Sequence, residues 1–474
     1  MEIKLEELYH KLAEYGQSDY YPYHMPGHKR RPVTQLLERI GDIDITEIEG
    51  FDNLHHAEGI LKQVQEHAAA ICGAEESFLL VGGSTAGILS AVGATIPSGG
   101  KLLMARGSHK SVYHSAYLGK LRTEYLYENI HPEMNFALAI TPEQVQEALA
   151  EHSDAGAVLI VSPTYEGMCC DVEKIAEIVH QKGIPLIVDG AHGAHLGFHP
   201  AWPEAASKCG ADLVIQSLHK TLPAPTQTAI LHVNGKLVDR SRLQRFLSIY
   251  QTSSPSYVLM AGMEQALSYM KSEGRLAMHV FLQNWETMLQ KLQACKNLQV
   301  YPNWQERGND IGKLVISAQG AGISGQRLYD ILLSEYHLQM EMACGSYVLA
   351  MFTVADTEEG YERLTKALLE IDSRLQQEEK KLRSTADIPF YPRKKLELWQ
   401  AWDTGHIVLP LEECQGKTAA EFINLYPPGI PVAVPGEVLN FQVLSQIRAY
   451  IQENLPVHGL VNDNGKVGMY VMDE

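Results

Sequence analysis

The feature that most constrains the fold of this chain is a regular alternation of short apolar runs and helix-like segments between residues 73 and 233. Runs as apolar as these are typical of strands that are buried on both faces of a sheet. Between them lie amphipathic segments such as 172–182, which Gly183 ends. The alternation predicts an α/β fold with a largely parallel sheet. The expected strands are 78–81, 101–105, 157–161, 185–188, 213–215 and 228–233.

The remainder of the chain predicts further domains, because 474 residues correspond to about three domains of roughly 150 residues each. A helical pattern covers 257–295, and a second strand-and-helix section at 313–375 predicts a smaller domain. Trp399, Trp402 and the proline-rich run at 426–435 suggest an α+β subdomain at the end. We expect four parts: an N-terminal segment at 1–60 that contacts a second subunit, a large domain at 61–295, a small α/β domain at 296–385 and a C-terminal subdomain at 386–474.

The charge balance and the cysteines disfavour several classes of protein. The chain has 39 Lys and Arg against 57 Asp and Glu, a net charge of −18, which argues against nucleic acid and anionic membranes as partners. Seven cysteines without a C-x-x-C pair, and an amphipathic rather than apolar start at 1–16, favour a cytoplasmic protein. The uncharged stretch 77–100 is long enough to cross a bilayer, but its glycines predict a strand followed by a helix instead.

A glycine-rich loop, Gly-Gly-Ser-Thr-Ala-Gly at 82–87, follows an expected strand and precedes an expected helix that starts at Ile88. Backbone N–H groups, the hydroxyls of Ser84 and Thr85 and the helix dipole together favour an anion such as phosphate. The loop is not a Walker A motif, because Ile88 stands where that motif needs Lys. An ordinary glycine-rich turn is the alternative.

Two of the expected strands end in groups that are suited to catalysis. Asp189 ends one of them, and Ser217, His219 and Lys220 follow another. Open α/β sheets bind ligands at the carboxyl ends of their strands. Burial at this edge would lower the pKa of the Lys220 amine and make it nucleophilic. A phosphate loop, a strand-end acid and a strand-end lysine are the groups that pyridoxal 5′-phosphate (PLP) requires.

A metal site is an alternative interpretation of the same region. His192, His195 and His199 have spacings that metal sites use, and Asp189 would be a fourth ligand. Three glycines interrupt the segment, so the spacing need not bring the imidazoles to one face. We therefore predict no metal and expect His195 and His199 to be surface residues.

A second alternative is a dinucleotide site. A G-x-G-x-x-G pattern runs from Gly320 to Gly325 after the apolar run 313–317, and Glu341 follows about twenty residues later. This pattern would make the protein an NAD-dependent oxidoreductase. Two residues separate the run from the first glycine, and Ser324 is suited to cap the next helix, so a loop of the small domain is favoured.

Six motifs resemble the bacterial ornithine/lysine/arginine decarboxylase family, over about residues 20 to 440. The first motif lies so near the start that the chain resembles the short form, which lacks an N-terminal wing domain. The resemblance implies a fold-type-I, aminotransferase-like PLP enzyme that works as a homodimer with active sites at the subunit interface. The motifs are MPGHK (25–29), RGSHKS (106–111), PTYEG (163–167), DGAHGAH (189–195), SLHKT (217–221) and YPPGIP (426–431).

The same resemblance implies a role for each site residue. Lys220 would form the Schiff base with PLP, Asp189 would bind the pyridine nitrogen and His109 would stack on the ring. His192 would lie near the ring hydroxyl. The expected phosphate ligands are Ser84, Thr85, Ser217 and His219, with Thr252 or Ser253 from a second subunit.

The implied function is decarboxylation of arginine, lysine or ornithine to the corresponding di- or polyamine and CO2. Lys220 or His219 would return a proton to Cα after CO2 leaves. A non-catalytic binding protein with the PLP fold is the other alternative, although the presence of Lys220 and Asp189 argues against it. The distal cation of such a substrate needs an acidic group, for which the candidates are Glu47, Glu49, Asp52 and Glu341.

Overall fold

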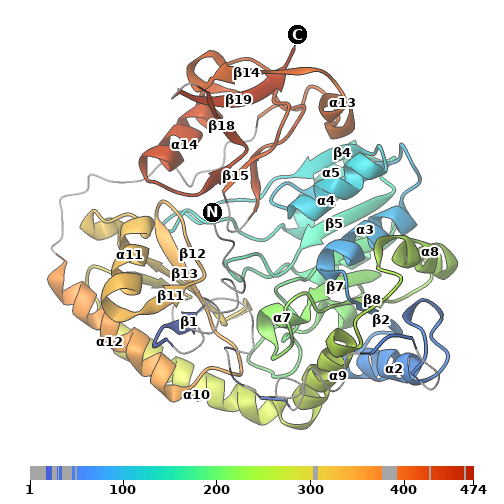
Figure 1. The fold of residues 1–474 in the computed structure, drawn as a ribbon, viewed down its shortest axis with the longest axis horizontal. Helices are drawn as coiled ribbons and strands as arrows, with labels where there is room; N and C mark the ends of the chain where they lie inside the picture. The colour runs from blue at the N-terminus through green and yellow to red at the C-terminus, as the bar shows by residue number, and fades with distance from the viewer. Residues whose placement is uncertain are drawn as a thin grey trace, which may run out of the picture.

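The structure, a computed structural model, has three regions in Figure 1: one built on the large sheet, a smaller one beside it and a C-terminal one above both. The amphipathic helix that we expect at 1–16 lies outside the described residues. The structure describes residues 18–23, 29, 31, 33–34, 45–47, 51–302, 308–375, 392–425, 429–463 and 466–473.

The large sheet has seven strands in the order β2-β8-β7-β6-β5-β3-β4. Strands β3 to β7 are parallel to one another, and β8 is antiparallel to both of its neighbours. The predicted α/β fold with a mainly parallel sheet is therefore confirmed. The strands are β2 Glu76–Leu80, β3 Lys101–Ala105, β4 Arg122–Leu126, β5 Ala157–Val161, β6 Leu186–Asp189, β7 Leu213–Ser217 and β8 Ala229–Val233.

The edge strand β4 is the one strand of this sheet that the sequence did not predict. Its residues include Arg122 and Glu124, and only two of its five residues are buried. A strand at the sheet edge needs no continuous apolar run, because one side is covered only in part. Strands β3 and β5 match the predicted ranges, since all residues of β5 and all but Lys101 of β3 are apolar.

Helices cover both faces of this sheet, which gives the region three layers. On one face α3, α4 and α8 pack against strand residues such as Leu102, and on the other α5 and α6 pack against Leu103. Helix α3 begins at Gly83 rather than at Ile88, so its first turn contains the glycine-rich loop. The helices are α2 Ile60–Cys72, α3 Gly83–Thr95, α4 Lys110–Leu118, α5 Pro142–Glu151, α6 Val172–His180, α7 Leu218–Thr221 and α8 Arg240–Tyr250, with short 3-10 helices at Leu54–His56 and Ala206–Lys208.

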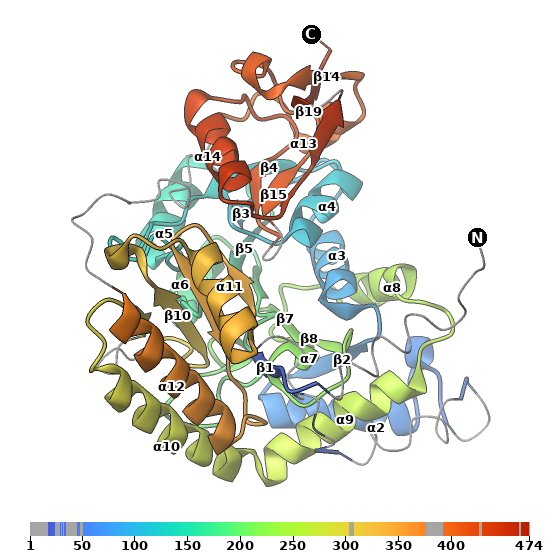
Figure 2. The same cartoon turned by 60° about the vertical axis from the view of Figure 1, so that its left-hand side comes forward.

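The smaller region contains an antiparallel sheet in the order β12-β13-β10-β9. Helices α10 and α12 lie side by side along it in both views (Figures 1 and 2). The helical pattern predicted at 257–295 forms two helices, α9 and α10, which Glu273 separates. The elements are β1 Tyr21–Tyr23, α9 Tyr257–Ser272, α10 Gly274–Leu292, β9 Gln299–Tyr301, β10 Lys313–Ser317, a 3-10 helix Gln319–Ala321, α11 Gly325–Tyr336, β11 Leu338–Met340, β12 Met342–Ala343, β13 Tyr347–Met351 and α12 Glu358–Arg374; β1 pairs with β11.

The G-x-G-x-x-G pattern follows a strand of this antiparallel sheet and does not belong to a dinucleotide fold. Strand β10, which precedes the pattern, is antiparallel to both of its neighbours, whereas the dinucleotide fingerprint needs a parallel strand–helix–strand unit. Ser324 caps α11 by accepting a hydrogen bond from the N–H of Arg327 at 3.2 Å. The oxidoreductase alternative is therefore wrong, and the pattern is a loop of the smaller region.

The C-terminal region contains two three-stranded sheets, β14-β19-β18 and β16-β15-β17. It lies against the β3–β4 side of the large sheet (Figure 1), where Arg106 forms a buried ion pair with Glu437. The elements are α13 Leu398–Trp402, β14 His406–Pro410, a 3-10 helix Leu411–Glu413, β15 Ile423–Leu425, β16 Pro431–Ala433, α14 Phe441–Gln452, β17 Val457–His458, β18 Leu460–Asp463 and β19 Lys466–Met472.

Of the helices that the structure describes, none combines the length and the apolar character that crossing a membrane requires. The uncharged stretch at 77–100 forms β2 and α3, as the sequence predicts.

Candidate active site

A cavity of about 470 Å3 lies where four parallel strands of the large sheet end. The last residues of β3, β5, β6 and β7 all line it: Ala105, Val161, Asp189 and Ser217. This is the edge at which open α/β sheets bind ligands. Eight of the site residues that the sequence predicts line the cavity together: Ser84, Thr85, His109, Asp189, His192, Ser217, His219 and Lys220.

The first turn of α3 forms one end of this cavity. Gly83 has φ +70°, a backbone conformation that glycine adopts readily, and it turns the chain from β2 into the helix. The hydroxyls of Ser84 and Ser217 are hydrogen-bonded to each other at 2.6 Å between the oxygens. Since the first N–H groups of a helix have no partner within the helix, this turn with its hydroxyls can bind an anion.

Lys220 lies in the one-turn helix α7, directly after β7. Its Nζ is 3.0 Å from Nε2 of His192. Burial lowers the pKa of Lys220, and the negative charges of Asp189 and Glu341 oppose that shift in part. The pKa of His192 lies well below its usual range, first because of burial and then because of the Lys220 charge. His192 is therefore a neutral imidazole beside the amine.

Asp189 is the second buried ionisable group of the cavity. Only 5% of its surface is exposed, and its Oδ1 accepts the N–H of Ala191 at 3.2 Å. Burial raises the pKa of Asp189, while the ammonium of Lys220 favours the carboxylate. An acid in such surroundings is suited to pair with a cationic ring nitrogen.

His109 caps the N-terminus of α4 and faces the same cavity. Its Nδ1 accepts the N–H of Ser111 at 3.2 Å and lies 2.9 Å from the hydroxyl of that serine. Burial, together with the charge of Lys220, lowers the pKa of His109 to about 4. The imidazole is therefore neutral near pH 7, and a neutral ring can stack on an aromatic ligand.

His219 has a defined tautomer, because its Nδ1 lies 2.9 Å from the carbonyl oxygen of Thr228. A carbonyl can only accept, so Nδ1 carries the hydrogen and Nε2 is left as an acceptor. Burial lowers the pKa of His219.

The three histidines of the metal hypothesis have separate partners. His192 lies beside Lys220, whereas Nε2 of His195 is 2.8 Å from Oδ1 of Asp310. The ring of His199 packs edge-on against Trp202. His195 is buried, so the prediction that it lies on the surface is wrong. Within the described ranges, no group of three or more His, Cys, Asp or Glu side chains is placed to hold a metal ion.

Of the candidates for the distal cation, Glu341 lines the cavity, and the hydroxyl of Tyr165 donates to it. Asp52 does not line the cavity, and its carboxylate accepts backbone N–H groups at 2.7 to 3.1 Å. Glu47 also lies outside the cavity lining, and Glu49 is outside the described residues. These contacts hold the loop around Asp52, and its part in binding a substrate cation stays a prediction.

The sequence analysis missed two acidic residues that line the cavity. Glu128 follows the unpredicted strand β4, and its Oε1 accepts the N–H of Gly107 at 2.8 Å. Glu166 lies within the PTYEG motif, and the hydroxyl of Tyr347 donates to it at 2.8 Å. The motif at 163–167 could have pointed to Glu166 as a site residue. Glu128 could not be found in this way, because it follows a strand that no sequence pattern predicts.

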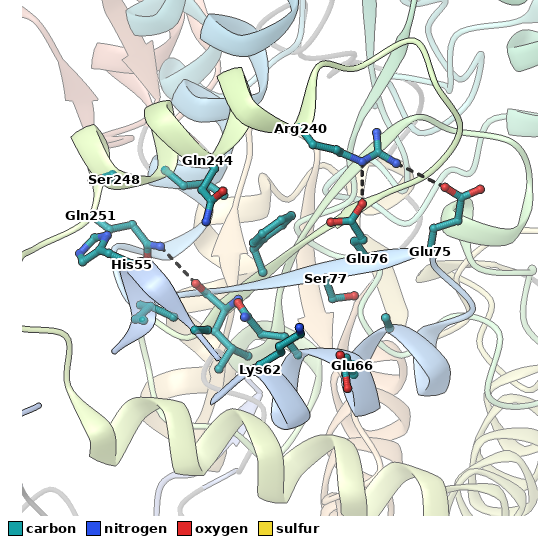
Figure 3. Close-up of a pocket in the computed structure, with 17 residues that line it drawn as sticks. His55, Lys62, Glu66, Glu75, Glu76, Ser77, Arg240, Gln244, Ser248 and Gln251 are labelled. Atoms are coloured by element: carbon teal, nitrogen blue, oxygen red, sulfur yellow. Dashed lines mark hydrogen bonds and ion pairs between the residues drawn. The ribbon is translucent and has the colours of Figure 1, made fainter. Parts of the chain in front are cut away.

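Thr252 and Ser253 lie outside the cavity lining and are exposed. Their predicted contact to a phosphate in a second subunit stays a prediction. A different cavity, of about 350 Å3, lies at the free edge of β2 between α2 and α8. Figure 3 shows Arg240 bridging Glu75 and Glu76 there, and Gln251 bound to the main chain of β2. It contains none of the predicted site residues.

Comparisons with known proteins agree over nearly the whole chain. The family model "Orn/Lys/Arg decarboxylase, major domain" matches residues 6–315, and the model of the C-terminal domain matches 399–471. An arginine decarboxylase of Bacillus anthracis is 31% identical over 95% of this chain and 94% of its own length. An arginine decarboxylase of Halalkalibacterium halodurans is 32% identical over 93% of this chain and 92% of its own length.

Solved structures share the fold. A lysine decarboxylase of Francisella novicida superposes with a TM-score of 0.76 at 19% identity, over 99% of this chain and 81% of that chain. A chain described as "SPT with PLP" superposes with a TM-score of 0.54 at 13% identity, over 72% of this chain and 81% of that chain. These similarities support the aminotransferase-like fold that the sequence predicts.

The major-domain model covers more than half of the chain, and the two arginine decarboxylases align with almost all of it at above 30% identity. This agreement sets aside the alternative of a non-catalytic binding protein. The chain belongs to the Orn/Lys/Arg decarboxylase family and is a decarboxylase of basic amino acids.

Proposed function

We propose that this decarboxylase depends on PLP and acts on L-arginine, with lysine and ornithine as poorer substrates, to release CO2 and the corresponding amine. The observation that carries the proposal is a single cavity that contains a buried lysine, a buried aspartate and the N-terminus of α3. The choice of arginine is supported by the full-length relatives, which are named arginine decarboxylases.

The residues present fit PLP in kind and in number. The first turn of α3 with Ser84, Thr85 and Ser217 would hold the phosphate, Asp189 would pair with the ring nitrogen and His109 would cover one ring face. Bound there, PLP would supply an electron sink for the pair left on Cα when CO2 departs.

Lys220 would hold the aldehyde carbon of the cofactor. Its lowered pKa increases the share of neutral amine, which is the nucleophilic form. His192, whose Nε2 is 3.0 Å from Nζ, orients the amine and stays neutral itself. Lys220 or His219 would then deliver the proton to Cα.

Asp189 would stabilise the charge of the ring nitrogen. The carboxylate of Asp189 favours a protonated ring nitrogen, since opposite charges stabilise each other strongly at a buried site. Because only 5% of the surface of Asp189 is exposed, little water reaches the carboxylate to weaken that interaction.

An absorbance spectrum and a CO2 assay test the proposal. The purified protein with PLP is expected to show a visible band that borohydride removes, and mass spectrometry should place the reduced adduct on Lys220. CO2 release should have its highest kcat/KM with arginine among the three amino acids. A protein that stays colourless with added PLP and releases no CO2 from any of them would falsify the proposal.

We also propose that the working unit is a homodimer with the active site at the interface. Support comes from the family resemblance and from the exposure of Thr252 and Ser253. Sedimentation should give the mass of a dimer, and replacing both residues with Ala should weaken PLP binding. A monomer with full activity contradicts this arrangement.

A further inference from the structure

A second cavity of about 130 Å3, lined in part by the C-terminal region, adjoins the catalytic cavity. Residues that line both cavities form their common wall: Gly107, Glu128, Ala137, Glu166 and Ile430. Two of these five residues are acidic, so this wall is a place where a positively charged group would be attracted.

Glu166 is the more informative of the two acids. Only 6% of its surface is exposed. Its Oε1 accepts the Tyr347 hydroxyl at 2.8 Å, and its Oε2 accepts the Thr164 hydroxyl at 3.4 Å. In the part of the chain that the structure describes, no Lys, Arg or His side chain forms an ion pair with Glu166.

Two other buried carboxylates of the described residues, Glu437 and Asp310, each have a cation. Glu437 is paired with Arg106 at 2.9 Å, and Asp310 is paired with Lys313 at 2.7 Å. A buried carboxylate without such a partner costs free energy, and burial accordingly raises the pKa of Glu166. The carboxylate keeps further lone pairs besides those used by the two hydroxyls, so a ligand cation can bind there.

The position of Glu166 suits the distal end of a substrate rather than its reacting end. Glu341 accepts from Tyr165, whose ring lies 4.5 Å from that of His192, the neighbour of Lys220, so Glu341 belongs to the reacting end. Glu166 lies on the wall shared with the second cavity. Arg106 also lines the second cavity, but its guanidinium donates to both carboxylate oxygens of Glu437 and its charge is compensated.

We propose that Glu166, with Glu128 on the same wall, binds the distal cation of the substrate and sets the preference for a basic side chain. This inference rests on the proposed arginine decarboxylation. A planar guanidinium can donate to two carboxylate oxygens at once, and charge-assisted bonds of this kind are stronger than neutral ones.

Glu166→Gln tests the inference, because Gln has nearly the same shape and lacks the charge. With the PLP-loaded enzyme, KM for arginine should rise roughly 10- to 100-fold while kcat changes little. Glu166→Gln should process citrulline, the neutral isostere of arginine, as poorly as the wild type does. The preference for arginine over citrulline should therefore fall by the same factor. Glu66→Gln, which removes an exposed carboxylate from the cavity at the edge of β2, is the matched control and should leave KM unchanged.

An unchanged KM and an unchanged preference in Glu166→Gln overturn the inference, and so does a loss confined to kcat. If Glu166→Gln does not fold, Tyr347→Phe decides the question, because it removes a hydroxyl that holds Glu166. A preference reduced about threefold or more supports the subsite, and an unaltered preference overturns it.

A binding measurement separates this inference from the proposed function. Agmatine, the amine that remains when arginine loses its carboxylate, should raise the melting temperature of the wild type and not that of Glu166→Gln. If the wild type releases no CO2 but agmatine still distinguishes the two proteins, the proposed function fails and the cation subsite stands. If agmatine stabilises both equally, the subsite is wrong whatever the activity.

Discussion

The two largest cavities described here are similar in size but differ in how their charges are arranged. The cavity at the strand ends measures about 470 Å3 and the cavity at the edge of β2 about 350 Å3. In the edge cavity Arg240 pairs with Glu76 at 2.8 Å and with Glu75 at 3.3 Å (Figure 3). Both glutamates are about half exposed or more, so water screens these pairs.

At the strand ends, by contrast, the ionisable groups are buried and line one cavity. Burial lowers the pKa of Lys220, raises that of Asp189 and raises that of Glu166. Such shifts cost stability, and groups that carry them in a cavity are candidates for function. The comparison teaches that the burial of charge, rather than the volume of a cavity, distinguishes the site.

The largest effect is expected from Lys220→Ala. In the proposed mechanism the amine attaches PLP covalently and can donate a proton, so its removal should lower kcat by roughly 10⁴-fold or more. CO2 release from arginine measures it. Lys62→Ala removes an exposed lysine from the edge cavity and should keep wild-type activity. A Lys220→Ala protein with more than a tenth of the wild-type rate would remove the distinction between the two cavities.

The next largest effect is expected on stability, from Arg106→Ala. This change leaves the Glu437 carboxylate buried without a cation, which should lower the free energy of unfolding by about 3–5 kcal/mol. Urea unfolding followed by two probes measures the loss. The double variant Arg106→Met, Glu437→Leu has no buried charge at these two positions and should recover much of the lost free energy of unfolding. A loss below about 1 kcal/mol for Arg106→Ala would mean that the pair does not hold the C-terminal region in place.

The sequence predicted the parts of the fold that depend on local pattern. Strands β3 and β5 agree with the predicted ranges because their apolar runs are continuous. The site residues at strand ends could also be predicted, since the topology of a parallel sheet brings Asp189 and Lys220 to one edge. Strand β4 could not be predicted, because Arg122 and Glu124 at the edge break the pattern.

The parts that the sequence missed depend on contacts between distant segments. Glu166 is recognisable as a cation-binding candidate only when Tyr347, which lies 181 positions away, is seen to hold it. Asp52 was one of four candidates for the substrate cation, and only the structure shows that its carboxylate accepts backbone N–H groups of its own loop. No periodicity or spacing contains this information, because it arises from tertiary packing.

A smaller effect concerns pH and a histidine behind the edge cavity. His232 is fully buried, its Nδ1 lies 2.7 Å from the hydroxyl oxygen of Ser77, and burial lowers its pKa from 6.5 to about 4. The unfolded chain therefore binds more protons than the folded one between these values, so stability falls as pH falls through this window. Over the whole window, protonation of His232 in the unfolded chain should lower the free energy of unfolding by about 3 kcal/mol.

Urea unfolding at pH 7 and pH 4 measures this contribution. His232→Gln should reduce the pH-dependent loss by about that amount, whereas the exposed His279→Gln should leave it unchanged. Equal pH dependence in His232→Gln and the wild type would show that the histidine does not titrate as its burial implies.

The smallest effect is expected from Arg240→Ala in the edge cavity. Because its partners Glu75 and Glu76 are exposed, losing these pairs should lower the free energy of unfolding by less than about 1 kcal/mol and leave kcat/KM unchanged. Thermal unfolding at low and high salt measures the first quantity, and the difference between the proteins should shrink as salt screens the pairs. If Arg240→Ala instead abolished activity in a folded protein, the edge cavity would take part in the reaction although water screens its charges. Charge burial would then be the wrong criterion for locating the active site.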